Sequence, residues 1–340
     1  MKKLLAVILA AAVLPVFAPA AQAQNLNEVF RKANPSVVVI RAKGRDVSSA
    51  GVTRFSETGS GVLVSADGKV MTAAHVVNAM DEITVEALGG EPVSAKIIAS
   101  EPAADLSLLQ LERVPPSMRA ARMADSSTVR VGDQVIVIGA PYGLSHSMSA
   151  GWISARWLPN TVYKRMPLAE FFQTTATINT GNSGGPMFNM AAEVIGIVSH
   201  NISKSGGSEG LGFVVTINTA KKLMLERKSF WSGIDGTMLT GDLAAIFNVP
   251  EPSGFLVKTV AQGSSAWDMG VLGGDKIATI GGQQIAVGGD IILSVDGIAV
   301  GSADNIEKIR NRLAAEPPGS PFKMKVLRAG KVIELTGKTQ

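Results

Sequence analysis

The sequence predicts a mainly β protein divided into two domains. Its 340 residues correspond to about two domains at roughly 150 residues each. The chain contains 36 glycines, and short runs rich in β-branched residues are each bounded by Gly, Asp or Pro. These runs lie at residues 37–40, 61–64, 83–85, 135–138 and 194–198. Many short strands separated by turn residues are typical of sandwiches and barrels.

Helical patterns are few, and they help to divide the chain. One covers residues 218–227, after a strand at 213–217. A second covers residues 303–313, where apolar side chains share one face after the candidate N-cap Ser302. Between them, residues 228–236 mix charge, serine and glycine with little periodicity. We therefore predict one domain over residues 24–232 and a second over residues 233–340.

The first 23 residues have the pattern of a secretory signal peptide. Lys2 and Lys3 precede an apolar run, and Ala21-Gln22-Ala23 matches a small-x-small cleavage site before Gln24. A retained membrane anchor is the alternative, but prolines interrupt the apolar run and it barely reaches spanning length. Cleavage removes two lysines and no acid, so the net charge of +4 becomes +2. The mature protein is expected to be soluble and exported.

Composition excludes several classes of function. The chain has no cysteine, which rules out disulfides, thiolate catalysis and Cys-ligated zinc. Aromatic residues make up only 5% of the chain and the charge is small, so the sequence does not predict a nucleic-acid binder. Three scattered histidines and the absence of a His-Glu-x-x-His or Gly-x-x-x-x-Gly-Lys pattern predict neither a metal site nor a phosphate loop. We expect no cofactor.

Two short segments carry candidate catalytic groups. His75 follows the strand-ending residues Thr72-Ala73-Ala74, and Asp105 stands at the head of an apolar strand. Taken alone, a single histidine is more often structural, and an aspartate before a strand more often caps a turn. Neither segment identifies a function by itself.

The third segment, residues 180–186, reads Thr-Gly-Asn-Ser-Gly-Gly-Pro and surrounds Ser183 with glycines. Glycines let the backbone turn tightly, expose the hydroxyl and leave N–H groups free to converge on an oxyanion. A plain Gly/Ser turn is the alternative. The order His75, Asp105, Ser183 is that of chymotrypsin-like barrels and differs from subtilisins and α/β-hydrolases. The set indicates a Ser-His-Asp catalytic triad.

Together these segments resemble the HtrA (Deg) family of exported, trypsin-like serine proteases, in register over about residues 26–225. Further matching motifs are Asn34-Pro35-Ser36-Val37-Val38, Gly59-Ser60-Gly61, residues 138–143, residues 173–179 and Gly210-Leu211-Gly212-Phe213. The resemblance implies two six-stranded β-barrels, with His75 and Asp105 from the first, Ser183 from the second, and the site in the cleft between them. It also implies a periplasmic enzyme that acts on unfolded or misfolded proteins and assembles as a homotrimer or a multiple of it.

The same resemblance implies the groups that would bind substrate. The oxyanion hole is expected from the backbone N–H groups of Gly181, Asn182 and Ser183, and a flipped peptide between Thr180 and Asn182 is expected to switch activity off. The primary pocket is expected to be lined by Thr177, Ile178, Ile197, Val198 and Ser199. No acid lies there, so medium apolar side chains are the expected preference. His200 is expected at the rim or surface.

The second domain resembles a single PDZ domain, an α+β module. Its marks are Gly254-Phe255-Leu256-Val257, Gly263-Ser264-Ser265-Ala266, Gly273-Gly274-Asp275, Val295-Asp296-Gly297 and the helix from Ala303. The resemblance implies that peptide C-termini add a strand along a groove. That groove would be formed by Gly236, Thr237, Met238, Leu239, Ile306 and Arg310. A role only in the core is the alternative for Ile306.

This domain contains a short internal sequence repeat. Residues 273–280 and 288–295 both begin Gly-Gly-Asp and continue with apolar alternation. We interpret the repeat as an inserted β-hairpin near residues 276–289, with Gly281-Gly282 at its turn. Such a hairpin would extend the sheet or contact another subunit.

Two functions remain open from the sequence. The first is an exported serine endopeptidase that hydrolyses peptide bonds of unfolded or damaged proteins, in envelope protein quality control and the stress response. The alternative is a PDZ-tethered chaperone or scaffold whose active site is rarely assembled.

Overall fold

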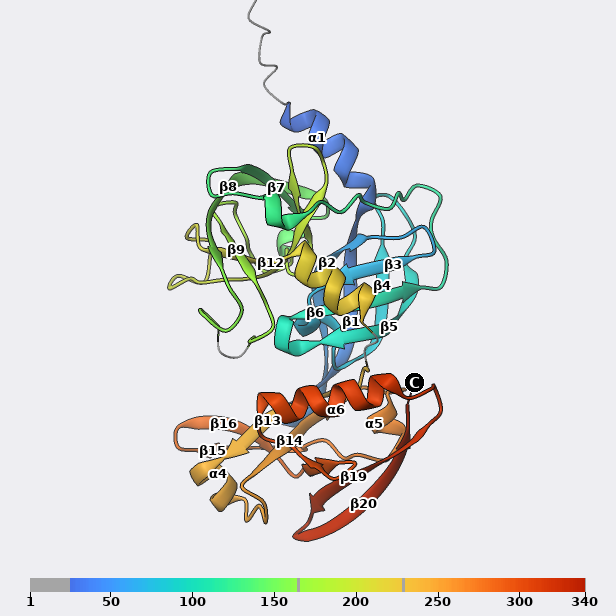
Figure 1. Ribbon diagram of the computed structural model, residues 1–340, viewed down its shortest axis with the longest axis vertical. Helices are drawn as coiled ribbons and strands as arrows, with labels where there is room; N and C mark the ends of the chain where they lie inside the picture. The colour runs from blue at the N-terminus through green and yellow to red at the C-terminus, as the bar shows by residue number, and fades with distance from the viewer. Residues whose placement is uncertain (1–24, 164–165, 228–229, 340) are drawn as a thin grey trace, which may run out of the picture.

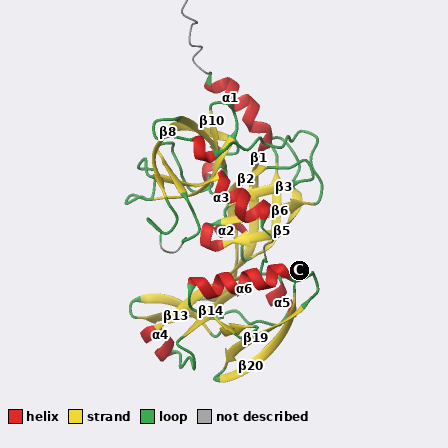
Figure 2. Cartoon of the chain, viewed as in Figure 1, coloured by secondary structure: helices red, strands yellow, loops and turns green. Residues whose placement is uncertain are grey.

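The computed structural model describes residues 25–163, 166–227 and 230–339, so the predicted signal peptide lies outside the described residues. The chain folds into two closed β-barrels followed by a smaller sheet domain (Figures 1 and 2). This architecture confirms the predicted mainly β fold and the pair of six-stranded barrels.

The first barrel is preceded by a short amphipathic helix, α1 (Leu26–Ala33), which the sequence analysis did not predict. Its six strands close in the order β1-β2-β3-β6-β5-β4. They are β1 (Val37–Ser48), β2 (Gly51–Leu63), β3 (Lys69–Thr72), β4 (Met80–Glu86), β5 (Val93–Glu101) and β6 (Leu106–Leu111). The connections include η1 (Asn34–Ser36), the single helical turn α2 (Ala74–Val77) and η2 (Pro102–Ala104).

The second barrel closes in the order β10-β11-β12-β9-β8-β7. Its strands are β7 (Gln134–Gly139), β8 (Ser147–Trp157), β9 (Phe171–Thr174), β10 (Pro186–Asn189), β11 (Val194–Asn201) and β12 (Gly212–Thr216). Short turns, η3 (Ser126–Thr128) and η4 (Pro141–Gly143), lie before β7 and after it. The helix expected at 218–227 is present as α3 (Ile217–Lys221) continued by a π-helical turn, η5 (Lys222–Glu226).

The two barrels share a hydrophobic core. Met71 and Leu106 of the first barrel belong to one buried cluster with Ile136, Phe188 and Ile197 of the second. Burial of this apolar surface fixes the barrels against each other. Loops at the junction are therefore held at defined positions.

The C-terminal domain is built on a sheet with the path β13-β14-β17-β19-β20, and β18 pairs with β17. Its strands are β13 (Ile234–Thr240), β14 (Ser253–Val260), β17 (Ile291–Val295), β18 (Ile298–Ala299), β19 (Pro321–Arg328) and β20 (Lys331–Lys338). Its helices are α4 (Gly241–Ile246), α5 (Ser265–Asp268) and α6 (Ala303–Ala315). The Ser302 hydroxyl caps α6 by accepting the N–H of Asn305 at 3.1 Å, the N-cap arrangement expected from the sequence.

A separate two-stranded hairpin lies within this domain. Strands β15 (Lys276–Ile280) and β16 (Gln283–Val287) pair antiparallel around Gly281 and Gly282. Both glycines have positive φ, +57° and +79°, as a two-residue hairpin turn requires. Ile285 of β16 is buried in a second apolar cluster of the domain with Leu239 and Leu256.

Helix α6 faces the barrels from the C-terminal domain (Figure 1). The Arg310 guanidinium on α6 forms an ion pair with the Glu101 carboxylate at the end of β5. The Trp231 indole N–H donates to the Asn78 carbonyl at 2.9 Å. The Arg45 guanidinium donates to the Val260 carbonyl at 3.0 Å. These polar contacts dock the C-terminal domain onto the first barrel.

Candidate active site

His75 and Asp105 are held together at the edge of the first barrel. His75 lies on α2, immediately after β3. Asp105 ends η2 with a left-handed backbone, φ 54°. The His75 Nδ1 lies 2.9 and 3.0 Å from the two Asp105 carboxylate oxygens, and the His75 backbone N–H donates to the same carboxylate at 3.1 Å. The carboxylate thus fixes both the ring and the backbone of His75.

Opposing effects set the charges of this pair. Burial lowers the pKa of His75, but the hydrogen bond and negative charge of Asp105 outweigh it and raise the pKa above its usual value. Burial raises the pKa of Asp105, yet donors from His75 and Ser199 hold it below its usual value. The Asp105 side chain is only 4% exposed, whereas that of His75 is 47% exposed. A buried, ionised carboxylate therefore supports an accessible imidazole.

Ser183 lies at the junction of the barrels and is connected to this pair through Ser199. Its carbonyl accepts the N–H of Ser60 of β2 at 2.8 Å, and its hydroxyl donates to the Ser199 carbonyl at 3.3 Å. Ser199 on β11 in turn donates its own hydroxyl to the Asp105 carboxylate. Within the described residues, no hydrogen bond joins the Ser183 hydroxyl to His75.

The peptide groups before Ser183 have fixed orientations. The Thr180 carbonyl accepts the Tyr142 N–H at 2.8 Å, and the Gly181 carbonyl accepts the Ser60 hydroxyl at 2.7 Å. A trans peptide directs its C=O and N–H to opposite sides, so the Gly181 N–H points away from Tyr142. In the described part of the chain, the N–H groups of Gly181 and Ser183 donate to no other residue. They are two of the three donors that the resemblance implies.

Asn182 differs from that expectation. Its N–H donates to the Asn179 carbonyl at 3.0 Å, closing a tight turn. Because this donor is already used and faces Asn179, it is not available for an oxyanion. The tight turn uses the Asn182 N–H in its own hydrogen bond and leaves the N–H groups of Gly181 and Ser183 without an acceptor among the described residues.

Glycine is required at two positions in this loop. A Cβ on Gly181 would overlap the Ala140 carbonyl oxygen, and a Cβ on Gly184 would overlap the Thr72 hydroxyl and the Ser60 carbonyl. Both residues also have positive φ, +100° and +80°, which disfavours other residues. The glycines flanking Ser183 thus permit close contact between the loop around Ser183 and both barrels.

The residues expected to form the primary pocket are mostly core residues. Ile178, Ile197 and Val198 are at most 2% exposed and pack within the apolar clusters of the second barrel and the barrel junction. Small barrels fill their interior with side chains, so these three side chains point into the cores, and the expectation that this segment lines the primary pocket stays a prediction. Thr177 is exposed, and its carbonyl accepts the Asn182 side-chain N–H at 3.3 Å.

His200 is half-buried and lines the active-site cavity, in line with the rim position expected from the sequence, but its packing was not predicted. Its ring packs among the aromatic rings of Tyr163, Phe171 and Phe213, and its Nδ1 lies 2.9 Å from the Ser199 hydroxyl. Sequence reasoning missed this contact because the aromatic partners come from three separate segments. The adjacent pair Ser199-His200, on a strand assigned to the site, was the available signal.

A cavity of about 650 Å³ opens at the active-site pair. His75, Asp105 and His200 contribute to its wall from the barrels, and Asp235 and Lys258 contribute from the C-terminal domain. The Lys258 ammonium forms a 2.8 Å ion pair with Asp46 at the end of β1. The C-terminal domain therefore forms part of the site.

A second cavity, of about 420 Å³, lies between β13 and α6. Of the residues expected to form the peptide groove, Gly236, Met238, Ile306 and Arg310 line it. Thr237 and Leu239 do not, because alternate side chains of a strand point to opposite faces. Leu239 is fully buried in the cluster on the other face.

This interdomain groove is closed on one side by the rest of the chain. Phe230 and Trp231, before β13, and Pro102 of η2 complete its wall. The Phe230 ring packs edge-on against Phe322 of β19, with centroids 5.7 Å apart. The groove is therefore apolar and faces the first barrel.

No group of three or more acidic or histidine side chains within residues 25–163, 166–227 and 230–339 is arranged to hold a metal ion. The same segments contain no helix of sufficient length and apolarity to span a bilayer.

Parts of both barrels match a known protein family. Residues 59–197 match the family described as "Trypsin-like peptidase domain". This range includes His75, Asp105 and Ser183, and it ends within β11. The double barrel and its junction loops are therefore those of a trypsin-like peptidase.

The relatives define the group more closely. The chain is 32% identical over 323 residues to the periplasmic pH-dependent serine endoprotease DegQ of Escherichia coli, covering 93% of this chain and 64% of DegQ. It is 35% identical over 293 residues to a probable periplasmic serine endoprotease, DegP-like, of Hahella chejuensis, covering 84% and 57%. The solved HtrA-type protease AlgW with decapeptide aligns with TM-score 0.52 and 26% identity over 92% of this chain and 97% of that one. The chain belongs to the HtrA/Deg family, and it spans less than two thirds of the length of these two curated relatives.

Proposed function

We propose that the chain is a serine endopeptidase in which Ser183 is the nucleophile, His75 the general base and Asp105 the group that orients His75. The Ser183 hydroxyl attacks a peptide carbonyl while His75 Nε2 accepts its proton, and the same proton then passes to the leaving amine. Asp105 keeps the His75 proton on Nδ1 and stabilises the imidazolium. A water molecule repeats the sequence on the acyl-enzyme.

The oxyanion of each tetrahedral intermediate is held by the N–H groups of Gly181 and Ser183. Each such donor contributes on the order of 3 kcal/mol to stabilising the transition state. Support comes from the inward bonds of the Thr180 and Gly181 carbonyls to Tyr142 and Ser60. These bonds keep carbonyl oxygens out of the position that the oxyanion needs.

The observation that carries this proposal is the arrangement around Ser199. Its carbonyl accepts from Ser183, and its hydroxyl donates to the carboxylate that binds His75. Ser199 thus connects Ser183 to the His75–Asp105 pair. We propose that the Ser183 side chain turns from the Ser199 carbonyl to His75 when substrate binds, because catalytic hydrogen bonds often form only with substrate present.

We further propose that the substrates are unfolded or damaged proteins of the periplasm, in protein quality control, and that the chain acts as a homotrimer. The names of the curated relatives support a periplasmic endoprotease. The apolar groove between β13 and α6 supports a PDZ-like domain that binds peptide C-termini by adding a strand to the free edge of β13. Medium apolar side chains remain the proposed preference at the cleavage site.

A fluorophosphonate probe tests the assignment. We expect stoichiometric modification of the chain spanning residues 24–340, located at Ser183 by peptide mapping and abolished in Ser183→Ala. Casein cleavage is expected to fall on the order of 10⁶-fold in the same variant. Casein cleavage that is unchanged in Ser183→Ala would refute the assignment.

The resting contact of Ser183 with the Ser199 carbonyl favours one alternative, a chaperone or scaffold whose active site is rarely assembled. The same probe separates the two. Absence of labelling under every condition, with suppression of aggregation retained in Ser183→Ala, would establish the alternative.

A further inference from the structure

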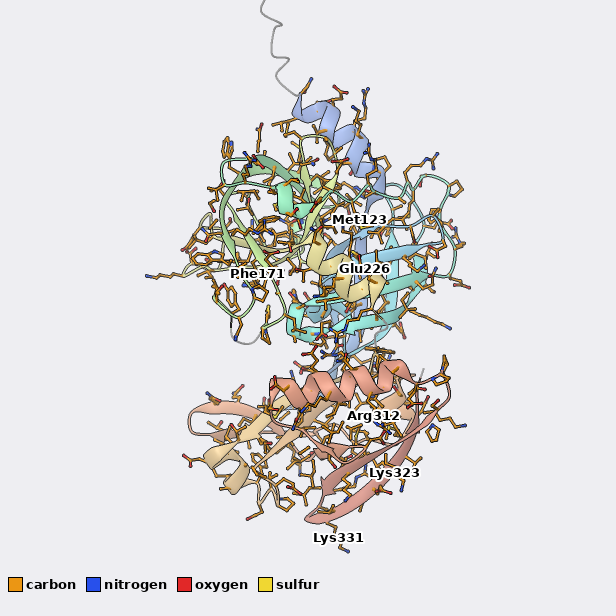
Figure 3. All side chains as sticks on the ribbon, in the orientation of Figure 1. Met123, Phe171, Glu226, Arg312, Lys323 and Lys331 are labelled. Carbon is orange, nitrogen blue, oxygen red and sulfur yellow. The ribbon has the colours of Figure 1, made fainter. Side chains whose placement is uncertain are left out.

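His200 occupies a fixed position behind the active-site carboxylate. Its ring stacks on Phe213, with centroids 5.2 Å apart and an interplanar angle of 10°. It meets Tyr163 edge-on at 4.3 Å and Phe171 at 5.7 Å. Phe171 is labelled on the second barrel in Figure 3. Three aromatic neighbours leave the imidazole little freedom to turn.

A continuous series of hydrogen bonds joins His200 to His75. The His200 Nδ1 lies 2.9 Å from the Ser199 hydroxyl oxygen, and that hydroxyl also contacts the Asp105 carboxylate. Asp105 in turn binds His75 Nδ1. The two histidines therefore lie at opposite ends of one polar chain.

The number of protons fixes the direction of these bonds. An ionised carboxylate only accepts hydrogen bonds, so the single Ser199 hydroxyl proton goes to Asp105. The Ser199 oxygen is then an acceptor toward His200, and the proton of the neutral imidazole lies on Nδ1. The His200 Nε2, which is buried, has no hydrogen-bond partner among the described residues, consistent with an unprotonated nitrogen.

His200 stays neutral where a serine peptidase works. Burial lowers its pKa to about 4, although the Asp105 charge opposes this, and a charged His75 lowers it further. Among the described residues, the remaining titratable group against the ring is the Tyr163 phenol, whose pKa is raised by burial. His200 therefore donates through Nδ1 throughout the neutral range without adding a charge.

We propose that His200 is a positioning residue, whose Nδ1–H holds the Ser199 hydroxyl in the orientation that donates to Asp105. The proposal rests on the proposed peptidase function. Without the His200 donor, the Ser199 hydroxyl is free to rotate and Asp105 loses part of its stabilisation. A less stabilised carboxylate is more basic, so it holds the His75 proton more tightly and raises the pKa of His75.

A double-mutant cycle measures this coupling in the chain spanning residues 24–340. His200→Phe keeps an aromatic ring in the cluster and removes both nitrogens, while Ser199→Ala removes the same link from its other end. We expect His200→Phe to lower kcat about 5-fold, the effect of one hydrogen bond, with KM changed less than twofold. The double variant is expected to match Ser199→Ala, because the two changes break one chain.

The same double-mutant cycle distinguishes a positioning role of His200 from a role in substrate contact. His200 lines the active-site cavity, so a role only in substrate contact predicts a raised KM, an unchanged kcat and additive effects. Any of these three results contradicts positioning. A shift of the acidic limb of kcat/KM to higher pH in His200→Phe is the expected signature of a raised His75 pKa.

A second measurement needs no activity. The chain contains three histidines, so ¹⁵N NMR of the imidazoles can follow His75, His146 and His200 separately in the Ser183→Ala protein. We expect the Nδ1–H tautomer for His200 and an upward shift of the His75 pKa on adding His200→Phe, or Ser199→Ala if the first variant does not fold. An Nε2–H tautomer, or an unchanged His75 pKa, refutes positioning. Failure of Ser183 to label refutes the peptidase instead, and the titration still decides the role of His200.

Discussion

The active-site cleft and the interdomain groove are both built at boundaries between folded units, yet they are held in different ways. In the cleft, Ser60, Ser199 and backbone carbonyls connect the two barrels through short hydrogen bonds over a shared apolar core. In the groove, the C-terminal domain meets the first barrel through a few side chains, with the buried pair Arg310 and Glu101 among them. A hydrogen-bond network over a shared apolar core fixes groups precisely, whereas a contact made by a few side chains can be weakened by one substitution.

The largest effect is expected from Asp105→Asn. The amide of asparagine would donate toward His75 Nδ1 and favour the tautomer that cannot accept the Ser183 proton. We expect kcat to fall on the order of 10⁴-fold with the unfolding temperature nearly unchanged, measured by peptide hydrolysis and thermal denaturation. Asp125→Asn is the matched control, because its exposed carboxylate caps η3 away from the cleft. A loss below 10-fold in Asp105→Asn, or an equal loss in the control, would contradict the assigned role.

The next prediction tests whether close backbone packing holds the loop around Ser183 in place. Gly184→Ala places a Cβ against the Thr72 hydroxyl and the Ser60 carbonyl, at φ +80°. Steric overlap and backbone strain together are expected to lower the free energy of unfolding by roughly 3–5 kcal/mol, measured by urea denaturation. Gly206→Ala has a similar φ, +86°, with no atom near its Cβ, and it is expected to lose about 1 kcal/mol. Equal losses at both positions would show that close packing does not hold the loop.

The difference between local backbone contacts and packing of distant side chains explains what the sequence could predict. The β-branched runs punctuated by glycine predicted a mainly β fold, and the family resemblance implied the two barrels. The glycines that flank Ser183 indicated a tightly packed loop, and backbone contacts require them. The groups near Asp105 that come from side-chain packing were missed, since the aromatic rings around His200 lie far apart in the sequence. The burial of the expected pocket residues Ile197 and Val198 was not predicted for a related reason. Alternation along β11 directs them into two cores, and a strand sequence does not reveal which faces a barrel buries.

The interdomain groove was partly predicted and its contact with the barrels was not. Gly236, Met238, Ile306 and Arg310 were expected to share a groove, and the structure brings them to one cavity. Nothing in the sequence pairs Arg310 with Glu101, which is 209 positions earlier by their residue numbers. Ion pairs between domains depend on how the domains dock, and local patterns carry no record of that geometry.

The smallest of these effects is expected at the docking contact itself. Burial raises the pKa of Glu101 even though the Arg310 charge opposes it, so this carboxylate is desolvated at a cost. Glu101→Gln keeps the shape but leaves the Arg310 charge without its partner, and the expected loss is about 3 kcal/mol of docking stability. Hydrogen exchange is expected to quicken in α6 and at the end of β5 while the cleft strands stay protected. Replacing both residues by methionine removes the uncompensated charge and is expected to restore slow exchange. Lys258→Met removes an exposed ion pair with Asp46, and it is expected to change the docking stability by less than about 1 kcal/mol. Equal hydrogen exchange in Glu101→Gln and Lys258→Met would show that the buried ion pair does not fix the C-terminal domain. Docking would then depend on apolar packing at Phe230 and Trp231, and the contrast between cleft and groove would rest on that packing.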